Sequence, residues 1–478
     1  MKKLFFFLFL FIEITCLSQK KCSDYIKDWA NHCARYGYSS YNDTVFIKDV
    51  NGIIGNENKS LLLADLPKSK TENSLYFYND WHWLNINLPN NNNKGVAGSL
   101  LGLARIYFVS TYLYPYKEEI VDVMNSKLPI YIDKLMKSDT ELNRHLILLE
   151  YSCFIKDSHG SISVGLSGSK ELTDFFGVYR PSTILEINEG GVIIQNSTLK
   201  KIKPFIGDTI TSINNVEINH LIDSLKPYIN TSTTNGMHRD ISWTILCGSK
   251  NTTISFKTKD GDVFSLKRNL STRRWGKEYF PRQKTFQKIG INHYYVAFGN
   301  VKSKKRAKRI CKKLTPNDTL IIDLTSGGNN IEDTWIQEFA LNSNIPCMNY
   351  FCHTLNKENK FIKTTTPMKV EYKLDSTKRP SVILLINENT FSHTEYVAMK
   401  LKTYCNALII GKPSNGTDGD NCYLPIYNGF YTFMTGLGIE WPNSDKIQRV
   451  GLIPDVPLNF NSSNKIEKIT EYVNNVNH

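Results

Sequence analysis

The spacing of apolar positions changes twice along the chain, and each change indicates a different kind of secondary structure. Over residues 97–155 apolar side chains recur every three or four positions, as at Leu100 and Leu103, which is typical of amphipathic helices. Tyr114-Pro115-Tyr116 interrupts the pattern, Glu118 to Met136 predicts a second helix, and Ser138 with Glu141 has the capping-box spacing that opens a third. We therefore expect residues 20–160 to form an N-terminal domain that is mixed at first and then mostly helical.

A second pattern, short runs of strand-forming residues, begins near residue 180. Thr253–Thr258 and Val263–Lys267 flank Asp260-Gly261, a dipeptide that favours a β-hairpin. Similar strand-like runs are Thr183–Ile187, Val192–Gln195, Ile206–Ile210 and Ser212–Val216. Residues 175–275 are therefore expected to form a small β-rich module.

From about residue 285 onward, nearly continuous apolar strands alternate with helices. Strands of this kind are buried on both faces, so the alternation predicts an α/β layer fold around a buried sheet, over residues 285–465. The expected strands are Tyr294–Phe298, Leu320–Leu324, Val382–Ile386 and Leu408–Ile410, and the expected helices are Ser303–Leu314, Ile331–Asn342 and Thr394–Thr403. With 478 residues the whole chain is expected to be multidomain.

Charge and cysteine usage narrow the classes of function. The formal net charge is +13, but the basic residues are scattered and no stretch interleaves them with aromatics, so nucleic-acid binding is not expected. No cysteine pair has zinc-type spacing with histidines, and nothing in the sequence implies a metal or a cofactor. Cys22 and Cys33 are a candidate disulfide pair, although connectivity cannot be read from sequence.

The first residues have the form of a secretion signal. Met1-Lys2-Lys3 is positively charged, and the apolar run Leu4–Ile12 is too short to cross a bilayer. Residues 1–19 are therefore expected to be a cleaved signal peptide, which predicts an exported protein, periplasmic or extracellular, without a transmembrane segment. Cys16 would suit a lipoprotein anchor, but Glu13 stands where that signal needs an apolar residue, so such anchoring is not favoured.

Two residues stand where catalysis could occur. Ser392 follows the apolar strand Val382–Ile386 and begins a helix, so its hydroxyl should lie at the carboxyl edge of the sheet, beside helix N–H groups that suit an oxyanion. His159 carries an imidazole that can accept a serine's proton near neutral pH. Each residue alone is ambiguous, because a serine or histidine at a helix end often only caps it.

Five short motifs in a fixed order are more specific than either residue. Asp157-Ser158-His159-Gly160 comes first, followed by Ile206-Gly207-Asp208-Thr209-Ile210 inside the β-rich module. Ile321-Ile322-Asp323-Leu324, Thr390-Phe391-Ser392-His393-Thr394-Glu395 and Gly451-Leu452-Ile453-Pro454-Asp455 then complete the series. In this order the motifs resemble the tail-specific (C-terminal-processing) serine proteases, particularly the branch similar to the tricorn core.

The resemblance implies both an architecture and a class of substrate. The α/β region would be a catalytic core of ClpP/crotonase-like stacked β-β-α units, and the β-rich module would be PDZ-like. PDZ-like modules bind peptide tails by adding a strand to a sheet edge. The implied partners are peptides or unfolded proteins, and the family resemblance implies no metal and no cofactor.

The resemblance also assigns roles to single residues. Ser392 matches the family nucleophile, in its Ser-x-x-Glu setting with Glu395. Ser158-His159 matches the serine and the general base of the tricorn-like branch, in which Ser158 could help to orient the site. The oxyanion hole would combine the backbone N–H of His393 with one from Gly327 or Gly328.

This chain departs from the family pattern at several of these positions. Thr325 stands where the family has arginine in its glycine turn, and Gln448 stands where the glutamate that orients the histidine is expected. A glutamine can accept the imidazole N–H bond but offers no negative charge; Glu440 is the nearest acidic alternative in sequence. The lysine of the family's other catalytic arrangement would fall near Thr417, and Lys412 comes too early, so a Ser–Lys dyad is disfavoured.

Three hypotheses follow. The leading one is acyl transfer to water, with Ser392 attacking a peptide carbonyl and His159 moving the proton. The second is a catalytically weak or inactive homologue that binds peptides or apolar ligands, and the third is a different acyl chemistry on the same fold. A serine-reactive fluorophosphonate probe separates the first from the second.

Overall fold

A computed structural model describes residues 22–35, 43–44, 46–48, 50, 76–78, 84–86, 90–161, 168–272, 284–355, 361–374, 380–461 and 464–476. The predicted signal peptide lies outside these residues. The chain forms two compact units, each described by itself below. The first contains residues 1–175, 351–364 and 421–437, and the second contains 176–350, 365–420 and 438–478.

The predicted helices of the first unit are present and pack against one another. They are α3 (Gly95–Phe108), α4 (Val121–Met136) and α5 (Glu141–Ser152). Helix α5 begins two residues later than the predicted cap requires, so Thr140 rather than Ser138 caps it, by accepting the N–H of Asn143. Cys22 carries a free thiol, so the candidate disulfide with Cys33 is not formed.

Helix α3 is almost completely buried. It continues through a π-helical turn to Leu113, and together these 19 residues are long and apolar enough to cross a membrane. However, 83% of the most apolar stretch is buried inside the protein, as the core helix of a globular unit would be. Its close neighbour is strand β18 (Asp420–Tyr427): Arg105 Nη1 donates to the Pro425 carbonyl at 3.1 Å, and a Cβ at Gly102 would lie 3.1 Å from the Ile426 carbonyl oxygen.

Four strands that the sequence pattern did not predict form a sheet in the order β15-β14-β19-β18. Besides β18 they are β14 (Pro346–Leu355), β15 (Phe361–Lys369) and β19 (Phe430–Glu440). The chain passes from one unit to the other within each of these four strands.

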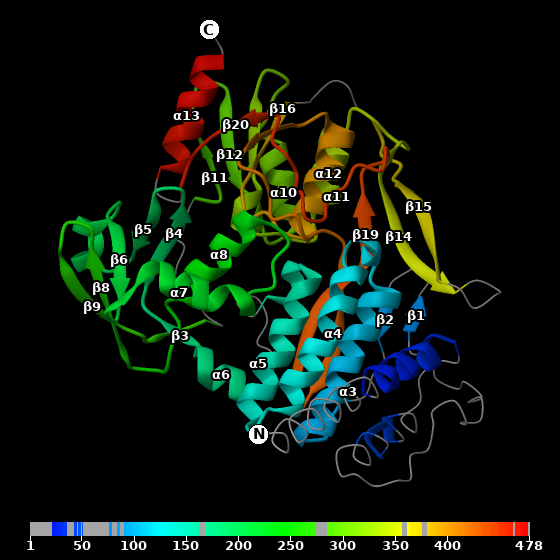
Figure 1. Ribbon diagram of the computed structural model, residues 1–478. Coiled ribbons are helices and arrows are strands. Elements are labelled where there is room, and N and C mark those ends of the chain that lie inside the picture. Colours follow the sequence, from blue (N-terminus) through cyan, green and yellow to red (C-terminus); the bar gives the residue numbers. More distant parts are fainter. Residues whose placement is uncertain are drawn as a thin grey trace, which may run out of the picture. The chain divides into compact units, whose positions relative to one another are not determined.

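The second unit contains the predicted α/β layer (Figure 1). Its sheet has the order β11-β12-β13-β16-β17-β20, and all neighbours from β12 to β20 run parallel. The strands are β11 (Phe286–Lys288), β12 (His293–Ala297), β13 (Thr319–Asp323), β16 (Ser381–Ile386), β17 (Leu408–Gly411) and β20 (Val456–Pro457). The helices are α10 (Lys304–Cys311), α11 (Glu332–Phe339), α12 (His393–Cys405) and α13 (Lys465–Val476). This arrangement confirms a multidomain α/β fold with several sheets.

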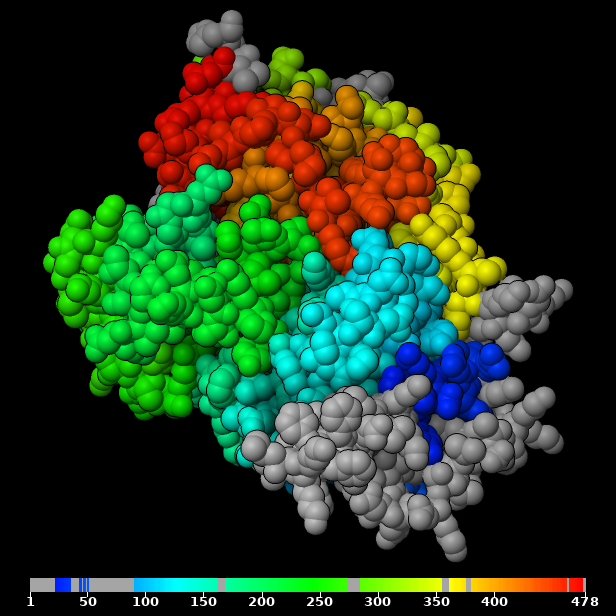
Figure 2. Space-filling model, viewed as in Figure 1, coloured from blue at the N-terminus to red at the C-terminus, as the bar shows by residue number. Residues whose placement is uncertain are grey.

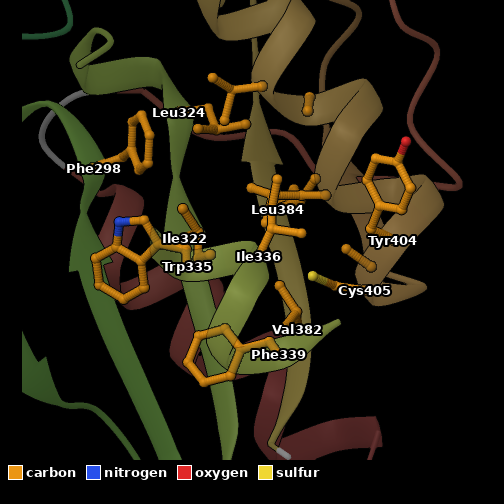
Figure 3. Packing of buried hydrophobic residues seen from close by; sticks show 14 of the residues in the cluster. Phe298, Ile322, Leu324, Trp335, Ile336, Phe339, Val382, Leu384, Tyr404 and Cys405 are labelled. Carbon is orange, nitrogen blue, oxygen red and sulfur yellow. The ribbon is translucent and has the colours of Figure 1, made fainter. Parts of the chain in front are cut away.

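Alternate residues of the central strands serve two separate apolar cores. Leu320, Ile322 and Leu384 point toward the side covered by α10, α11 and α12, and Figure 3 shows Ile322 and Leu384 beside Trp335 and Ile336 of α11. Ile321, Ile383 and Leu385 face the opposite side, where Ile469 and Val473 of α13 pack. Burial on both faces explains why these strands read as unbroken apolar runs.

Helix α10 carries a cluster of positively charged side chains. This cluster was not predicted, because the basic residues were described as scattered along the sequence. Its apolar side, with Ala307 and Ile310, is buried in the core. Its other side exposes five lysine and arginine side chains, Lys304, Lys305, Arg306, Lys308 and Arg309.

The parallel register brings three strand ends to one edge of the sheet. Asp323 ends β13 beside Leu385, and Ile386 ends β16 opposite Gly411, the last residue of β17. Gly411 has φ +125°, and a Cβ there would lie 2.1 Å from the Ile386 carbonyl oxygen, so this position requires glycine. The loops that follow these strands carry the candidate site.

The predicted β-rich module also lies in the second unit and contains a sheet in the order β4-β5-β6-β8-β9, with β7 beside β6. Asp260-Gly261 forms the predicted turn between β8 and β9, and Gly261 has φ +93°. Two helices that were not predicted, α7 (Ile218–Leu225) and α8 (Thr234–Thr244), complete it, and α8 packs on β4. These residues, green in Figure 2, gather into one lobe. The strands are β4 (Thr183–Asn188), β5 (Gly191–Ser197), β6 (Thr209–Ile213), β7 (Val216–Glu217), β8 (Thr253–Thr258) and β9 (Val263–Lys267).

Candidate active site

Ser392 occupies a strained turn between β16 and α12. Its backbone has φ +51° and ψ −115°, a region that costs a non-glycine residue about 1–3 kcal/mol and is found mainly at functional sites. Its N–H lies 2.9 Å from the Thr417 carbonyl and 3.0 Å from Glu395 Oε2, and its hydroxyl donates to the Gly419 carbonyl at 3.4 Å. The turn presents the hydroxyl at the start of α12, at the predicted edge of the sheet.

Glu395 ties this turn to the loop after β17. Besides the N–H of Ser392, its carboxylate accepts the N–H of Gly416 at 2.7 Å, the N–H of Thr417 at 3.1 Å and the Ser414 hydroxyl at 2.5 Å. The side chain is fully buried. Burial raises the pKa of Glu395 above its ordinary value, although the four hydrogen bonds act in the opposite direction. The Ser-x-x-Glu spacing therefore has a structural basis: the glutamate holds the serine's backbone.

Asp418 is a second buried carboxyl in the same loop. Oδ1 accepts the Gly419 N–H at 2.7 Å, whereas Oδ2 has no hydrogen-bond partner among the described residues. Burial, followed by the charge of Glu395, raises the pKa of Asp418 well above its ordinary value. The folded state therefore holds this proton more tightly than the unfolded chain does. The stability that the proton contributes is complete below about pH 4 and is lost as the pH rises through the raised pKa.

The variant Asp418→Asn should accordingly be more stable than the wild type in alkaline solution. The amide keeps an oxygen for the Gly419 N–H and cannot ionise, so we expect the free energy of unfolding to rise by about 1–3 kcal/mol at pH 8 and to change little at pH 4. Chemical denaturation at the two pH values measures the difference. A lower stability of the variant at pH 8 would contradict the assignment.

The predicted oxyanion-hole residues come close together. A Cβ at Gly328 would lie 3.0 Å from His393 Cδ2, and Gly327 has φ +94° in the same turn. The His393 ring nitrogen Nε2 lies 2.9 Å from the Asn329 carbonyl, which joins α12 to the glycine turn. The structure therefore brings His393 and the glycine turn into contact beside Ser392.

A buried ion pair anchors the start of the glycine turn. Asp323 Oδ1 accepts the N–H and the hydroxyl of Thr325, and Asp323 also accepts the Tyr295 hydroxyl. Lys465 of α13 places its ammonium 2.6 Å from Asp323 Oδ2 and 3.1 Å from Thr325 Oγ1. A lysine from the last helix thus supplies positive charge at Thr325, where the family has arginine.

His159 belongs to the first unit, whereas Ser392 belongs to the second. It lies in a buried 3₁₀ turn, Ser158–Gly160, and Ser158 in the same turn is also buried. The ring nitrogen Nδ1 is 3.1 Å from Asp157 Oδ1 and 3.1 Å from Thr435 Oγ1. Sequence reasoning quoted Asp157 within the motif but gave it no role; its position two residues before the histidine was the available signal.

Two further residues were considered as candidates from the sequence, Gln448 and Lys412. Both have partners in the second unit. Gln448 Oε1 accepts the Asp418 N–H at 3.1 Å, and its amide nitrogen donates to Ser232 Oγ at 3.4 Å. Lys412 Nζ lies 3.4 Å from Glu186 Oε1. In the described part of the chain, no group of three or more histidine, cysteine or acidic side chains could hold a metal ion.

One family model and several solved structures are similar to parts of this chain. The family model named Peptidase family S41 matches residues 285–458, and no curated protein matches the chain. Among solved structures, mature CPAF in complex with lactacystin has a TM-score of 0.55 at 12% identity, covering 79% of this chain and 97% of CPAF. The photosystem II D1 C-terminal processing protease gives 0.43 at 13% identity, covering 76% and 92%. The tricorn protease gives 0.36 at 12% identity, covering 79% and 37%. The residues that match Peptidase family S41 contain the α/β layer and the strained serine turn, so this part of the chain is similar to the S41 peptidases.

Proposed function

We propose that this chain is an S41 peptidase that hydrolyses peptide bonds through an acyl-enzyme on Ser392, with His159 as the general base. The observation that carries the nucleophile is the strained backbone of Ser392 at the N-terminus of α12, held there by Glu395. A hydroxyl exposed on such a turn can reach a carbonyl carbon while helix N–H groups face the developing oxyanion.

The reaction would begin when His159 takes the proton from the Ser392 hydroxyl as the oxygen attacks the peptide carbonyl. The imidazolium then gives this proton to the leaving amine, and a water molecule, activated by the same imidazole, hydrolyses the acyl-enzyme. The backbone N–H of His393 and one from Gly327 or Gly328 would bind the oxyanion. The contact between His393 and Gly328 supports this pairing of donors.

The β-rich module, residues 175–275, is proposed to be PDZ-like and to recruit peptide tails. Its five-strand path with two helices offers sheet edges at β4 and β9, and edge strands can accept a peptide as an additional strand. Residues 285–465 would form the ClpP/crotonase-like core, and residues 20–160 the N-terminal domain. Residues 1–19 would direct export to a periplasmic or extracellular site.

The second candidate is a homologue that binds peptides without cutting them. The observation that favours it is Gln448, a neutral side chain at the position of the family's glutamate, engaged with Asp418 and Ser232. Ser158 would then be a structural residue of the histidine turn.

A fluorophosphonate probe tests the proposal on the full chain. The wild type should be labelled at about one equivalent, and Ser392→Ala should not be labelled, because the probe reacts with base-activated serines. Lys412→Ala, which breaks an ion pair with Glu186, is the matched control and should be labelled like the wild type. Labelling that persists without Ser392 would refute the nucleophile, and an unlabelled wild type that binds peptides would favour the second candidate.

A further inference from the structure

We infer that Asp157, and not the residue at position 448, is the carboxylate that orients the general base and stabilises its protonated form. The inference deepens the proposed function and rests on the assignment of Ser392 and His159 as nucleophile and base. Asp157 is a positioning residue, because it acts on the imidazole and not on the substrate.

The contacts of Asp157 fit this role. Oδ1 lies 3.1 Å from His159 Nδ1 and also accepts the backbone N–H of His159 at 3.0 Å. Oδ2 accepts the backbone N–H of Thr435 at 2.7 Å. The carboxylate is fully buried, so both its oxygens are fixed by neighbouring groups and not by bulk water. Asp157 thus holds the imidazole between its own turn and strand β19.

The charge state of Asp157 also suits a group that orients and stabilises an imidazolium. Burial alone would raise its pKa, but the neighbouring His159 imidazole and the hydrogen bonds from His159 and Thr435 lower the pKa to about 2. Asp157 is therefore ionised throughout the pH range in which a histidine titrates. A carboxylate only accepts hydrogen bonds, so the hydrogen of the neutral ring sits on Nδ1. That leaves Nε2 with the lone pair that a general base needs.

If Asp157 only capped the turn, its contacts with the His159 ring and with strand β19 would have no explanation. An aspartate that caps a turn needs one oxygen for one backbone N–H, as in the bond from the His159 N–H. Here the same oxygen is also within hydrogen-bond distance of the ring, and the second oxygen is bonded to a different strand. The Thr435 hydroxyl, 3.1 Å from Nδ1, is neutral and adds a second contact to the same side of the ring. Asp157 is a charged partner of the His159 ring within the first unit.

Gln448 has a different task in this arrangement. Its side chain accepts the N–H of Asp418 and donates to Ser232, so it holds the loop around Asp418. The same loop carries Thr417 and Gly419, whose carbonyl groups accept hydrogen bonds from Ser392. A glutamate here would place a further carboxyl beside the buried Asp418, whose pKa is already raised by burial and by Glu395. A neutral side chain at position 448 is therefore compatible with Asp157 as the carboxylate partner of the imidazole.

The test measures the rate of fluorophosphonate labelling at Ser392 between pH 5 and 9 in the full chain. With its remaining oxygen on the Thr435 N–H, Asp157→Asn turns an N–H group toward the ring and the His159 N–H, which favours the wrong tautomer. We expect the labelling rate at pH 7 to fall by about 10²- to 10⁴-fold. The acidic limb of the pH profile should also move to lower pH, because the imidazolium loses its anionic partner. Gln448→Glu should produce no gain in rate, alone or combined with Asp157→Asn.

The outcomes separate this inference from the proposed function. If Ser392→Ala and His159→Ala abolish labelling but Asp157→Asn keeps the wild-type rate and profile, the inference is wrong while the proposed function stands. A gain of tenfold or more from Gln448→Glu would also overturn the inference. If His159→Ala is labelled normally, the proposed function itself fails. If Asp157→Asn does not fold, the proton NMR spectrum of the wild type tests the inference instead. A strongly downfield imidazole N–H resonance that is lost in His159→Ala supports the contact with Asp157. The absence of this resonance overturns the inference.

Discussion

Replacement of His159 by alanine is expected to lower kcat/KM for peptide hydrolysis by about a thousandfold or more. Without the imidazole nothing takes the proton from the Ser392 hydroxyl, and the alcohol is a weak nucleophile at neutral pH. Residual activity would come from the oxyanion donors and from substrate binding alone. Hydrolysis of a fluorogenic peptide library, followed at enzyme excess, measures the loss.

Two controls accompany this variant: its own melting temperature and the activity of a second variant, Lys412→Ala. His159→Ala should have a lower melting temperature, because the buried Asp157 loses its partner, but should remain folded at the assay temperature, so that the loss of activity reports chemistry and not unfolding. Lys412→Ala should retain nearly full activity. If His159→Ala remains active and Lys412→Ala is inactive, the base is a lysine and the histidine assignment must be abandoned.

Replacement of Glu395 by alanine should damage both stability and reactivity. The carboxylate accepts four hydrogen bonds in a fully buried position. Its removal leaves the N–H groups of Gly416 and Thr417 and the Ser414 hydroxyl without this acceptor, while the Ser392 N–H keeps the Thr417 carbonyl. Each unsatisfied buried donor costs about 1–3 kcal/mol, so we expect the unfolding free energy to fall by about 3 kcal/mol or more. The strained turn at Ser392 also loses a restraint, so labelling by the probe should slow at least tenfold.

A matched glutamate outside this network provides the control. Glu338 is exposed on α11, and Glu338→Ala should change stability by less than about 0.5 kcal/mol and leave labelling unchanged. Differential scanning fluorimetry and the labelling rate can be measured on the same samples. Wild-type labelling in a folded Glu395→Ala protein would show that the glutamate does not hold the nucleophile.

Strands β12, β13, β16 and β17 and helices α10, α11 and α12 of the α/β layer were predictable because two physical signals agree there, whereas β11, β20 and α13 were not predicted. Strands β13 and β16 are buried on both faces, so their apolar runs are unbroken, and each is followed by a helix. The strands β14, β15, β18 and β19 were missed. Strand β15, for example, has mostly exposed or half-buried residues and reads as a polar segment with Lys363 and Lys369. Its place in a sheet depends on pairing with β14, which no local pattern reveals.

The candidate site was predictable to the extent that topology fixes it. Ser392, His393 and Gly328 follow the carboxyl ends of parallel strands, and such ends meet at one edge of a sheet. The role of Asp157 was not predictable, because an aspartate two residues before a histidine has the form of an ordinary turn cap. Its burial and its contact with the ring are tertiary facts. The same is true of Asp418, whose raised pKa depends on the distant Glu395.

The packing of β18 on α3 means that the segment matched by the peptidase family is not self-sufficient. Residues 285–458 include Pro425 and Ile426, yet these residues contact Arg105 and Gly102, and the bond from Arg105 to Pro425 spans 320 positions of the chain. A fragment trimmed to the family boundaries would leave the apolar side of this strand exposed to water. Such a fragment should be prone to aggregation, so the hydrolytic machinery and the helical region that precedes it have to be produced, and to evolve, as one piece.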